Sequence, residues 1–182
     1  GGRAWTSPIT FGAGGHCALD CGAAIDFCDI DPRTYNLSVD ALAEKLEQAK
    51  GIGRLPKVVI PVHLCGQSCE MDRIQALAQQ YGFGIIEDAS HAIGGSYKDE
   101  PGGSCRYSDI TAFSFHQVKI VTTAEGGLAL TDDPRQARRL DPPRSHRLTR
   151  RAPADTHRPA GPWSTHATQP RSTPPHTHPA PH

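Results

Sequence analysis

An acid and an amine stand out because each follows a short apolar run with the composition of a β-strand. Asp88 follows residues 83–86, and Lys119 lies in a loop shortly after residues 110–115. Side chains that follow strands of an α/β sheet gather at its carboxyl edge, where such sheets bind their ligands. We therefore expect Asp88 and Lys119 to contribute to one site at that edge.

These two residue types suit one particular cofactor chemistry. A lysine amine forms a Schiff base with a carbonyl compound. Pyridoxal phosphate uses such a lysine, together with an acid that faces its ring nitrogen. That acid keeps the ring protonated, so that the ring can accept electrons from a carbanion. The residues alone leave a second interpretation open, in which Asp88 caps a helix and Lys119 lies on the surface.

Two helices are predicted from apolar periodicity and from their end signals. The first spans residues 39–50, with Ser38 as its N-cap and Gly51 at its end. The second spans residues 71–81, has an apolar stripe along one side and is ended by Gly82. Both helices are short enough to pack on a sheet.

Several apolar or alternating segments before, between and after these helices predict strands. A short extended piece is expected at residues 9–11, and the strands are expected at residues 24–30, 57–62, 83–86, 110–115 and 127–131. The order strand, helix, strand over residues 57–86 is a βαβ unit, which is parallel and right-handed. The fold class is therefore α/β. The GAGGH run at residues 12–16 is interpreted as a turn or as a place where backbone approaches a ligand.

Charge and composition limit the partners. The 182 residues carry no formal net charge, with a pI near 7.3, so we expect neither nucleic acid nor a membrane surface as a partner. The chain begins without Met or a signal-peptide pattern, which suggests a fragment. Residues 1–140 form the predicted domain. Residues 142–182 hold ten of the sixteen prolines and six of the ten histidines, so residues 141–182 are predicted to be a disordered tail.

Cysteines raise the question of a metal or of disulfides. Two pairs have a spacing of four: Cys17 with Cys21, and Cys65 with Cys69. Three histidines would be available to complete a site: His16, His63 and His91. This spacing is only just permissive for zinc, and an α/β chain does not need disulfides. We expect no metal, and thiols in a reducing compartment, the cytoplasm.

Residues 5–132 resemble the sugar aminotransferases of the DegT/DnrJ/StrS family, which use pyridoxal phosphate. The run EDASHA at residues 87–92 is similar to the acid motif of the family, and SFHQVKIVTTAEGG at residues 114–127 is similar to its lysine loop. TSPITF at residues 6–11 is similar to a segment whose aromatic residue stacks on the cofactor. The three motifs follow one another in the order that the family has.

The resemblance implies a role for individual side chains. Asp88 would face the ring nitrogen, and Lys119 would be the Schiff-base lysine. Ser114 would bind the cofactor phosphate. His91 would lie beside the cofactor, and Phe11 would stack on its ring.

The resemblance also implies a fold and a reaction. The fold would be a partial large domain of the aspartate-aminotransferase type, with a mixed, mostly parallel sheet flanked by helices, and the complete protein would be a homodimer. The amino group of glutamate would pass to the C4 ketone of a nucleotide-linked 4-keto-6-deoxy sugar. Within the family the likeness is strongest to the pseudaminic acid branch, through CALDCGA at residues 17–23 and DIDPRTYNLS at residues 29–38.

The sequence departs from the family pattern in three places. The start of the family's large domain is missing, with a Gly-Thr segment that holds the cofactor phosphate. After residue 140 the likeness breaks into a Pro-, His- and Arg-rich sequence, as a frameshift would produce. GAGGH replaces a small polar run. Three alternatives stay open: an aminotransferase for another nucleotide sugar, a dehydratase of the same scaffold, or a fragment that binds no cofactor. The related dehydratases have His in place of the lysine, which favours transamination.

Overall fold

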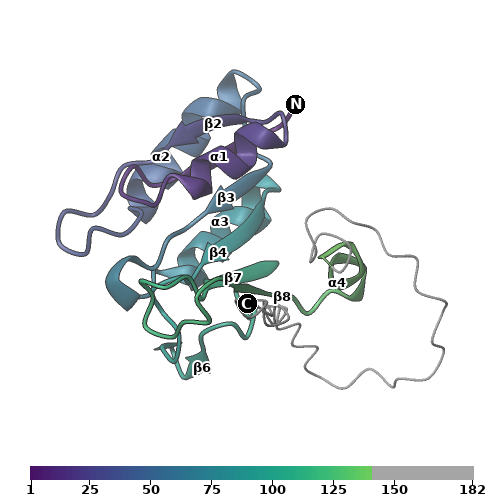
Figure 1. The fold of residues 1–182 in the computed structure, drawn as a ribbon. Coiled ribbons are helices and arrows are strands. Elements are labelled where there is room, and N and C mark those ends of the chain that lie inside the picture. The colour runs from purple at the N-terminus through teal and green to yellow at the C-terminus, as the bar shows by residue number, and fades with distance from the viewer. Residues whose placement is uncertain (141–182) are drawn as a thin grey trace, which may run out of the picture.

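The computed structural model describes residues 1–140 (Figure 1). The predicted disordered tail, residues 141–182, lies outside the described residues. None of the helices within residues 1–140 is both long enough and apolar enough to span a membrane.

A six-stranded sheet runs through the described part of the chain. In sheet order its strands are β2 (Ala24–Phe27), β1 (Arg3–Thr6), β3 (Val58–Ile60), β4 (Gly84–Asp88), β7 (Ile110–Ser114) and β8 (Gly127–Leu130). Neighbouring strands from β2 to β7 are parallel, and β8 is antiparallel to β7. The prediction of a mixed, mostly parallel α/β sheet is therefore confirmed.

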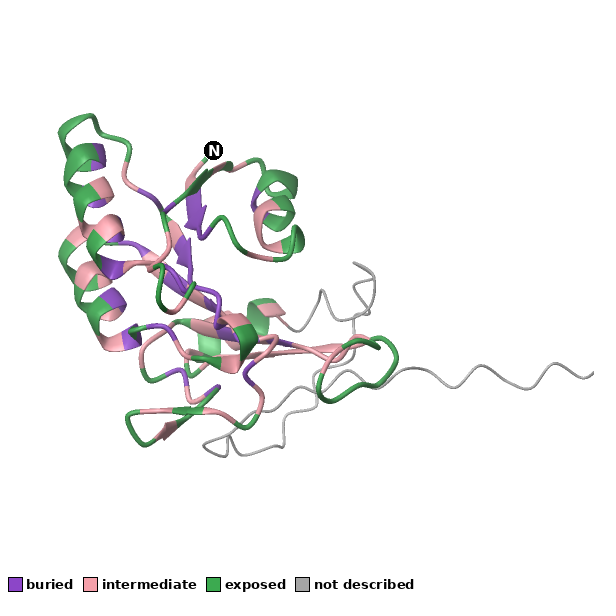
Figure 2. Cartoon of the chain, turned by 90° about the vertical axis from the view of Figure 1, so that its left-hand side faces the viewer, coloured by how far each residue is buried: buried purple, intermediate pink, exposed green. Residues whose placement is uncertain are grey.

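Helices cover both faces of this sheet (Figures 1 and 2). On one face lie α2 (Val39–Gly51) and α3 (Met71–Tyr81), whereas α1 (Ala13–Asp20) packs on β1 and β2 from the other. A 3-10 turn, η1 (Leu64–Gly66), follows β3, a small hairpin is formed by β5 (Ser96–Tyr97) and β6 (Glu100–Pro101), and α4 (Pro134–Leu140) follows β8.

The two predicted helices have the ends that their sequence signals indicate. The Ser38 hydroxyl accepts a hydrogen bond of 3.2 Å from the backbone N–H of Ala41 at the start of α2. Helix α3 spans the predicted residues and ends at Gly82, which has a left-handed φ of 76° that glycine adopts without strain. Capping of this kind stabilises a helix by about 1 kcal/mol and fixes where it begins.

The main core lies between the sheet and helices α2 and α3. Trp5, Val59 and Ile85 are in register across β1, β3 and β4, and all three are buried. Leu42 of α2 and Ile74 of α3 are fully buried against this row. Apolar burial is the main favourable term in folding, so this row fixes the positions of the three strands.

Two expectations for the N-terminal segment were wrong. Residues 9–11 are not extended; they form a loop in which the Ser7 hydroxyl donates to the carbonyl of Ile9, and the strand is β1, upstream. The GAGGH run is not a turn but enters α1, where the N–H of His16 donates to the carbonyl of Gly12. Strand β1 was missed because its four residues have mixed polarity and show no period. Helix α1 was missed because glycine has a low helix propensity, which packing can override.

Candidate functional site

Asp88 and Ser114 end two neighbouring parallel strands at the carboxyl edge of the sheet. Asp88 is in register with Ala112, and the N–H of Ala89 donates to the Ala112 carbonyl over 2.8 Å. Side chains alternate between the faces of a strand, so Ser114, two residues beyond Ala112, lies on the same face as Asp88. A carboxylate and a hydroxyl therefore share one edge and one face.

The segment that carries Lys119 leaves this same edge and returns to it. Residues 115–126 connect β7 to the antiparallel β8, and the loop is closed where the N–H of Phe115 donates to the carbonyl of Gly126 over 2.9 Å. The Lys119 N–H donates to the His116 carbonyl. The half-buried side chain of Lys119 makes no hydrogen bond or ion pair with any residue of the described part of the chain.

Asp88 is held by its backbone and keeps part of its carboxylate unengaged. Its N–H donates to the carbonyl of Pro61, and its carbonyl accepts from the N–H of His63, so β3 fixes the end of β4. One carboxylate oxygen, Oδ1, accepts from the N–H of Ser90 over 3.1 Å in an Asx turn. A turn and not a helix follows, so Asp88 does not cap a helix. Within residues 1–140, Oδ2 accepts no hydrogen bond.

The other two predicted cofactor residues, His91 and Phe11, differ in position and in burial. His91 is half-buried in the turn after β4, where its carbonyl lies against Gly66 of η1. Phe11 follows β1, which is separated from β4 by β3, and its side chain is 77% exposed. The Phe11 loop thus belongs to the same sheet edge, but the ring packs against no part of the buried core.

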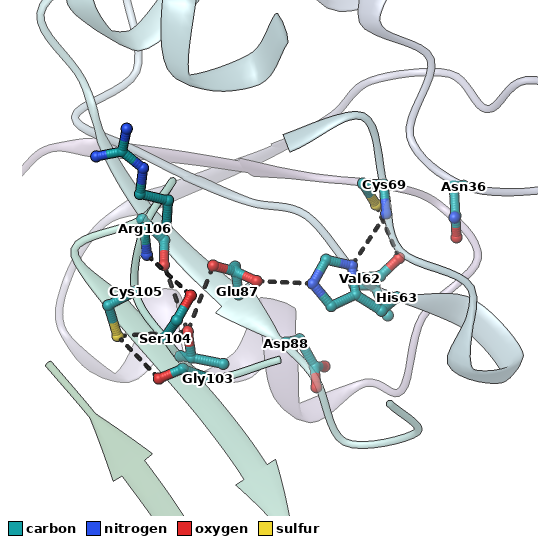
Figure 3. A network of polar contacts seen from close by, with 12 residues as sticks. Asn36, Val62, His63, Cys69, Glu87, Asp88, Gly103, Ser104, Cys105 and Arg106 are labelled. Carbon is teal, nitrogen blue, oxygen red and sulfur yellow. Dashed lines mark hydrogen bonds and ion pairs between the residues drawn. The ribbon is translucent and has the colours of Figure 1, made fainter. Parts of the chain in front are cut away.

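A buried acid and histidine lie on the opposite side of β4 from Asp88. His63 Nε2 and Glu87 Oε2 are 2.8 Å apart, and both residues are buried (Figure 3). Thr111 of β7 also donates to the Glu87 carboxylate. Burial raises the pKa of Glu87, but hydrogen bonds from His63, Ser108 and Thr111 outweigh it, so the pKa is lowered overall.

Sequence reasoning missed this pair. The sequence presents His63 as a candidate zinc ligand and Glu87 as part of the EDASHA run, and nothing in it pairs the two. The available signal was a charged residue inside an apolar strand, since such a residue is buried only when it has partners. Within residues 1–140, no three or more His, Cys, Asp or Glu side chains are arranged to hold a metal ion.

The groups at this edge suit pyridoxal phosphate. The cofactor needs an amine for its aldehyde, an acid for its ring nitrogen and donors for its phosphate. Within the described part of the chain, Lys119 has an unengaged amine, Asp88 has an unengaged carboxylate oxygen, and the Ser114 hydroxyl accepts only a long 3.4 Å bond from the N–H of His116. The residues present thus fit the cofactor, while the role of each toward it stays a prediction.

Comparisons with known proteins agree with this fit. The model of the DegT/DnrJ/EryC1/StrS aminotransferase family matches residues 2–159. The spore coat polysaccharide biosynthesis protein SpsC of Bacillus subtilis is 44% identical over 128 residues, which are 70% of this chain and 31% of that protein. The UDP-4-amino-4,6-dideoxy-N-acetyl-beta-L-altrosamine transaminase of Campylobacter jejuni (serotype O:2) is 37% identical over 147 residues, which are 80% of this chain and 37% of that protein.

Solved structures have the same fold. PseC of Helicobacter pylori, an aminotransferase involved in the biosynthesis of pseudoaminic acid, superposes with a TM-score of 0.72 at 29% identity, over 83% of this chain and 38% of that one. A putative sugar aminotransferase of Streptococcus pneumoniae in its PLP form superposes with a TM-score of 0.60 at 30% identity, over 74% and 36%. The chain therefore spans between about a third and two fifths of these relatives.

Proposed function

The chain belongs to the DegT/DnrJ/EryC1/StrS aminotransferase family, and from this premise we propose that it carries the cofactor site of a pyridoxal phosphate-dependent sugar aminotransferase. The reaction we propose moves the amino group of glutamate to the C4 ketone of a nucleotide-linked 4-keto-6-deoxy sugar. The activity and the partners are proposals for the whole protein, because the chain spans only 31% and 37% of the two relatives compared.

One observation supports this proposal most. Asp88 and Ser114 end adjacent parallel strands in register, on one face, and the loop bearing Lys119 begins directly after Ser114. A carboxylate, a hydroxyl and an amine are thus brought to one edge of the sheet. The pattern fits what the cofactor needs, because Lys119 and Asp88 are half-buried and neither Lys119 nor Asp88 Oδ2 has a partner within residues 1–140.

Pyridoxal phosphate, when bound, supplies an aldehyde for the amine and a ring that accepts electrons. Lys119 would hold the cofactor through its amine and, when that amine is free, would move a proton at the substrate carbon. General acid–base catalysis of this kind contributes about 10²–10⁴-fold. The Asp88 carboxylate would keep a proton on the ring nitrogen. Ser114 would bind the phosphate, His91 would lie beside the cofactor, and Phe11 would stack on the ring.

The finer features of the reaction follow from the likeness to individual relatives. The H. pylori aminotransferase involved in pseudoaminic acid biosynthesis and the UDP-sugar transaminase of C. jejuni support a sugar of the pseudaminic acid pathway, whereas SpsC is named for spore coat polysaccharide biosynthesis. We propose the pseudaminic acid substrate, a homodimer and a cytoplasmic location. A different nucleotide sugar is the alternative substrate, and a chain that binds no cofactor is the alternative state.

Covalent trapping tests the role of Lys119. The chain is incubated with pyridoxal phosphate, reduced with borohydride and digested with trypsin. A blocked Lys119 resists cleavage, so the phosphopyridoxyl group is expected on one peptide of residues 107–135, between Arg106 and Arg135. Without the label, trypsin gives residues 107–119 and 120–135 separately.

Two variants make this experiment specific. Lys119→Ala is expected to lose the label, and Lys50→Ala, which removes an exposed lysine on α2, is expected to keep it. An undiminished label in Lys119→Ala, or a label spread over surface lysines, would refute the assignment. No label in the unaltered chain would favour the alternative that this chain binds no cofactor.

A further inference from the structure

Glu87 is a charged side chain that is buried within the sheet, and such burial calls for an explanation. It is 8% exposed, and its neighbours in the sheet hold it from both sides. His63, beyond the end of β3, donates to Oε2, and Thr111 on β7 donates to Oε1 over 3.3 Å. Because burying a carboxylate is costly unless it is fully hydrogen-bonded, an apolar residue would fill this place with less penalty.

His63 contacts the end of β4 twice. Its ring holds the Glu87 carboxylate, and its backbone N–H donates to the carbonyl of Asp88 over 3.0 Å. The ring is fixed in turn, because its Nδ1 accepts a 3.1 Å hydrogen bond from the N–H of Cys69. Since Nδ1 is an acceptor, the ring proton is on Nε2, which is the nitrogen that faces Glu87.

The geometry connects this pair to Asp88 without direct contact. Glu87 and Asp88 are consecutive in β4, so their side chains point to opposite faces of the sheet. Figure 3 shows the Asp88 carboxylate directed away from the Glu87–His63 pair. A rotation of the strand end about its own axis would therefore move both side chains together, so the bonds that hold Glu87 add to the backbone bonds of Asp88 in resisting that rotation.

We propose that His63 and Glu87 are positioning residues, which lock the rotation of the end of β4 so that the Asp88 carboxylate faces the cofactor ring. This inference rests on the proposed function for its consequence at the cofactor. Its structural part, the locking of the strand end, does not depend on the cofactor. The two parts are therefore measured separately.

Hydrogen exchange in the absence of cofactor tests the locking. Glu87→Ala leaves the Nε2–H of His63 without an acceptor, so the amides of residues 84–91 are expected to exchange at least several-fold faster, while those of α2 do not change. Glu87→Gln keeps an acceptor for His63 and is expected to restore slow exchange. Leu46→Ala is the control for a general loss of core packing, because Leu46 is fully buried in the core and takes part in none of the hydrogen bonds around Glu87 and His63.

Titration with pyridoxal phosphate tests the consequence. Glu87→Ala is expected to bind the cofactor about tenfold more weakly, whereas Glu87→Gln and Leu46→Ala bind it like the unaltered chain. The proposal is overturned if Glu87→Ala leaves exchange at residues 84–91 unchanged, or if Leu46→Ala accelerates it equally. If the exchange result holds but the unaltered chain binds no pyridoxal phosphate, the locking stands and the proposed function fails.

Discussion

Two neighbouring carboxylates, Glu87 and Asp88, have opposite surroundings. Glu87 is buried and accepts hydrogen bonds from His63 and Thr111, whereas among residues 1–140 Asp88 accepts only from Ser90 and has one oxygen without a donor. The first arrangement suits a structural anchor. The second suits a group that meets a ligand. Alternation of side chains along one strand is enough to separate the two roles.

The lowered pKa of Glu87 predicts a pH dependence of stability. The ionised form is favoured in the folded protein, so the carboxylate contributes stability that is fully present above its ordinary value of 4.5 and is lost as the pH falls through the lower folded pKa. Glu87→Gln cannot be protonated, so the free energy of unfolding of this variant is expected to fall less steeply in acid. Urea unfolding at a series of pH values measures the difference.

Other charged groups also affect stability in acid, so this measurement needs a control. His63 faces Glu87 directly, and Arg106 and Glu100 line the small pocket beside it. Asp72, whose hydrogen bonds from Lys98 and Tyr97 lower its pKa to about 2, titrates elsewhere on the surface, so Asp72→Asn separates general acid effects from that of Glu87. If the free energy of unfolding falls equally steeply at low pH in Glu87→Gln and in the unaltered chain, the account is contradicted.

The chemistry-bearing residues were predictable only in part. Asp88 and Lys119 could be predicted because each follows an apolar run, and topology places such residues at one sheet edge. The His63–Glu87 pair could not, because the partners are 24 residues apart and pairing across strands depends on register. Register is set by packing between strands, which a single sequence does not display.

Among the elements, the turn η1 braces the segment that follows Asp88. Gly66 ends η1 with a φ of 87°, and a Cβ built there would lie 2.9 Å from the carbonyl oxygen of His91. Both the backbone conformation and the close approach therefore require glycine. The brace links the end of β3 to the turn that carries His91.

Substitution of Gly66 tests this brace, and Gly53 is a matched control. Gly53 also has a left-handed φ, of 65°, but a Cβ there meets nothing within 4 Å. Gly53→Ala is expected to cost about 1–2 kcal/mol of unfolding free energy from backbone strain alone. Gly66→Ala is expected to cost at least about 1 kcal/mol more, because the His91 segment must shift. If denaturant unfolding gives the same loss of unfolding free energy for Gly66→Ala and Gly53→Ala, the contact with His91 does not contribute to stability.

The elements differ in how well the sequence predicted them. Helix α3 has an apolar stripe and a glycine at its end, and its bounds were predicted to the residue. Strand β1 was not predicted, because its four residues give no period and its pairing with β2 and β3 is what makes it a strand. Helix α1 was hidden by its glycines, whose low helix propensity is overridden by packing on β1 and β2.

For the whole molecule, the order of the strands is what brings the proposed site together. The fold class was predicted from the βαβ unit and from the resemblance, and family membership and the superposed structures confirm it. The position of β1 beside both β2 and β3 could not be predicted, because strand order depends on which faces the helices cover. That order brings the loop of Phe11, the turn of His91 and the lysine loop to a common edge.

The central claim is that Asp88 and Lys119 flank one cofactor ring. Pyridoxal phosphate labelled with ¹⁵N at its ring nitrogen, bound to the unaltered chain and to Asp88→Asn, tests this claim most directly by NMR. A carboxylate stabilises the protonated ring and an amide does not, so we expect a protonated nitrogen in the first protein and a deprotonated one in the second, with the cofactor bound in both. The same nitrogen signal in both proteins, or no bound cofactor in the unaltered chain, would contradict the account.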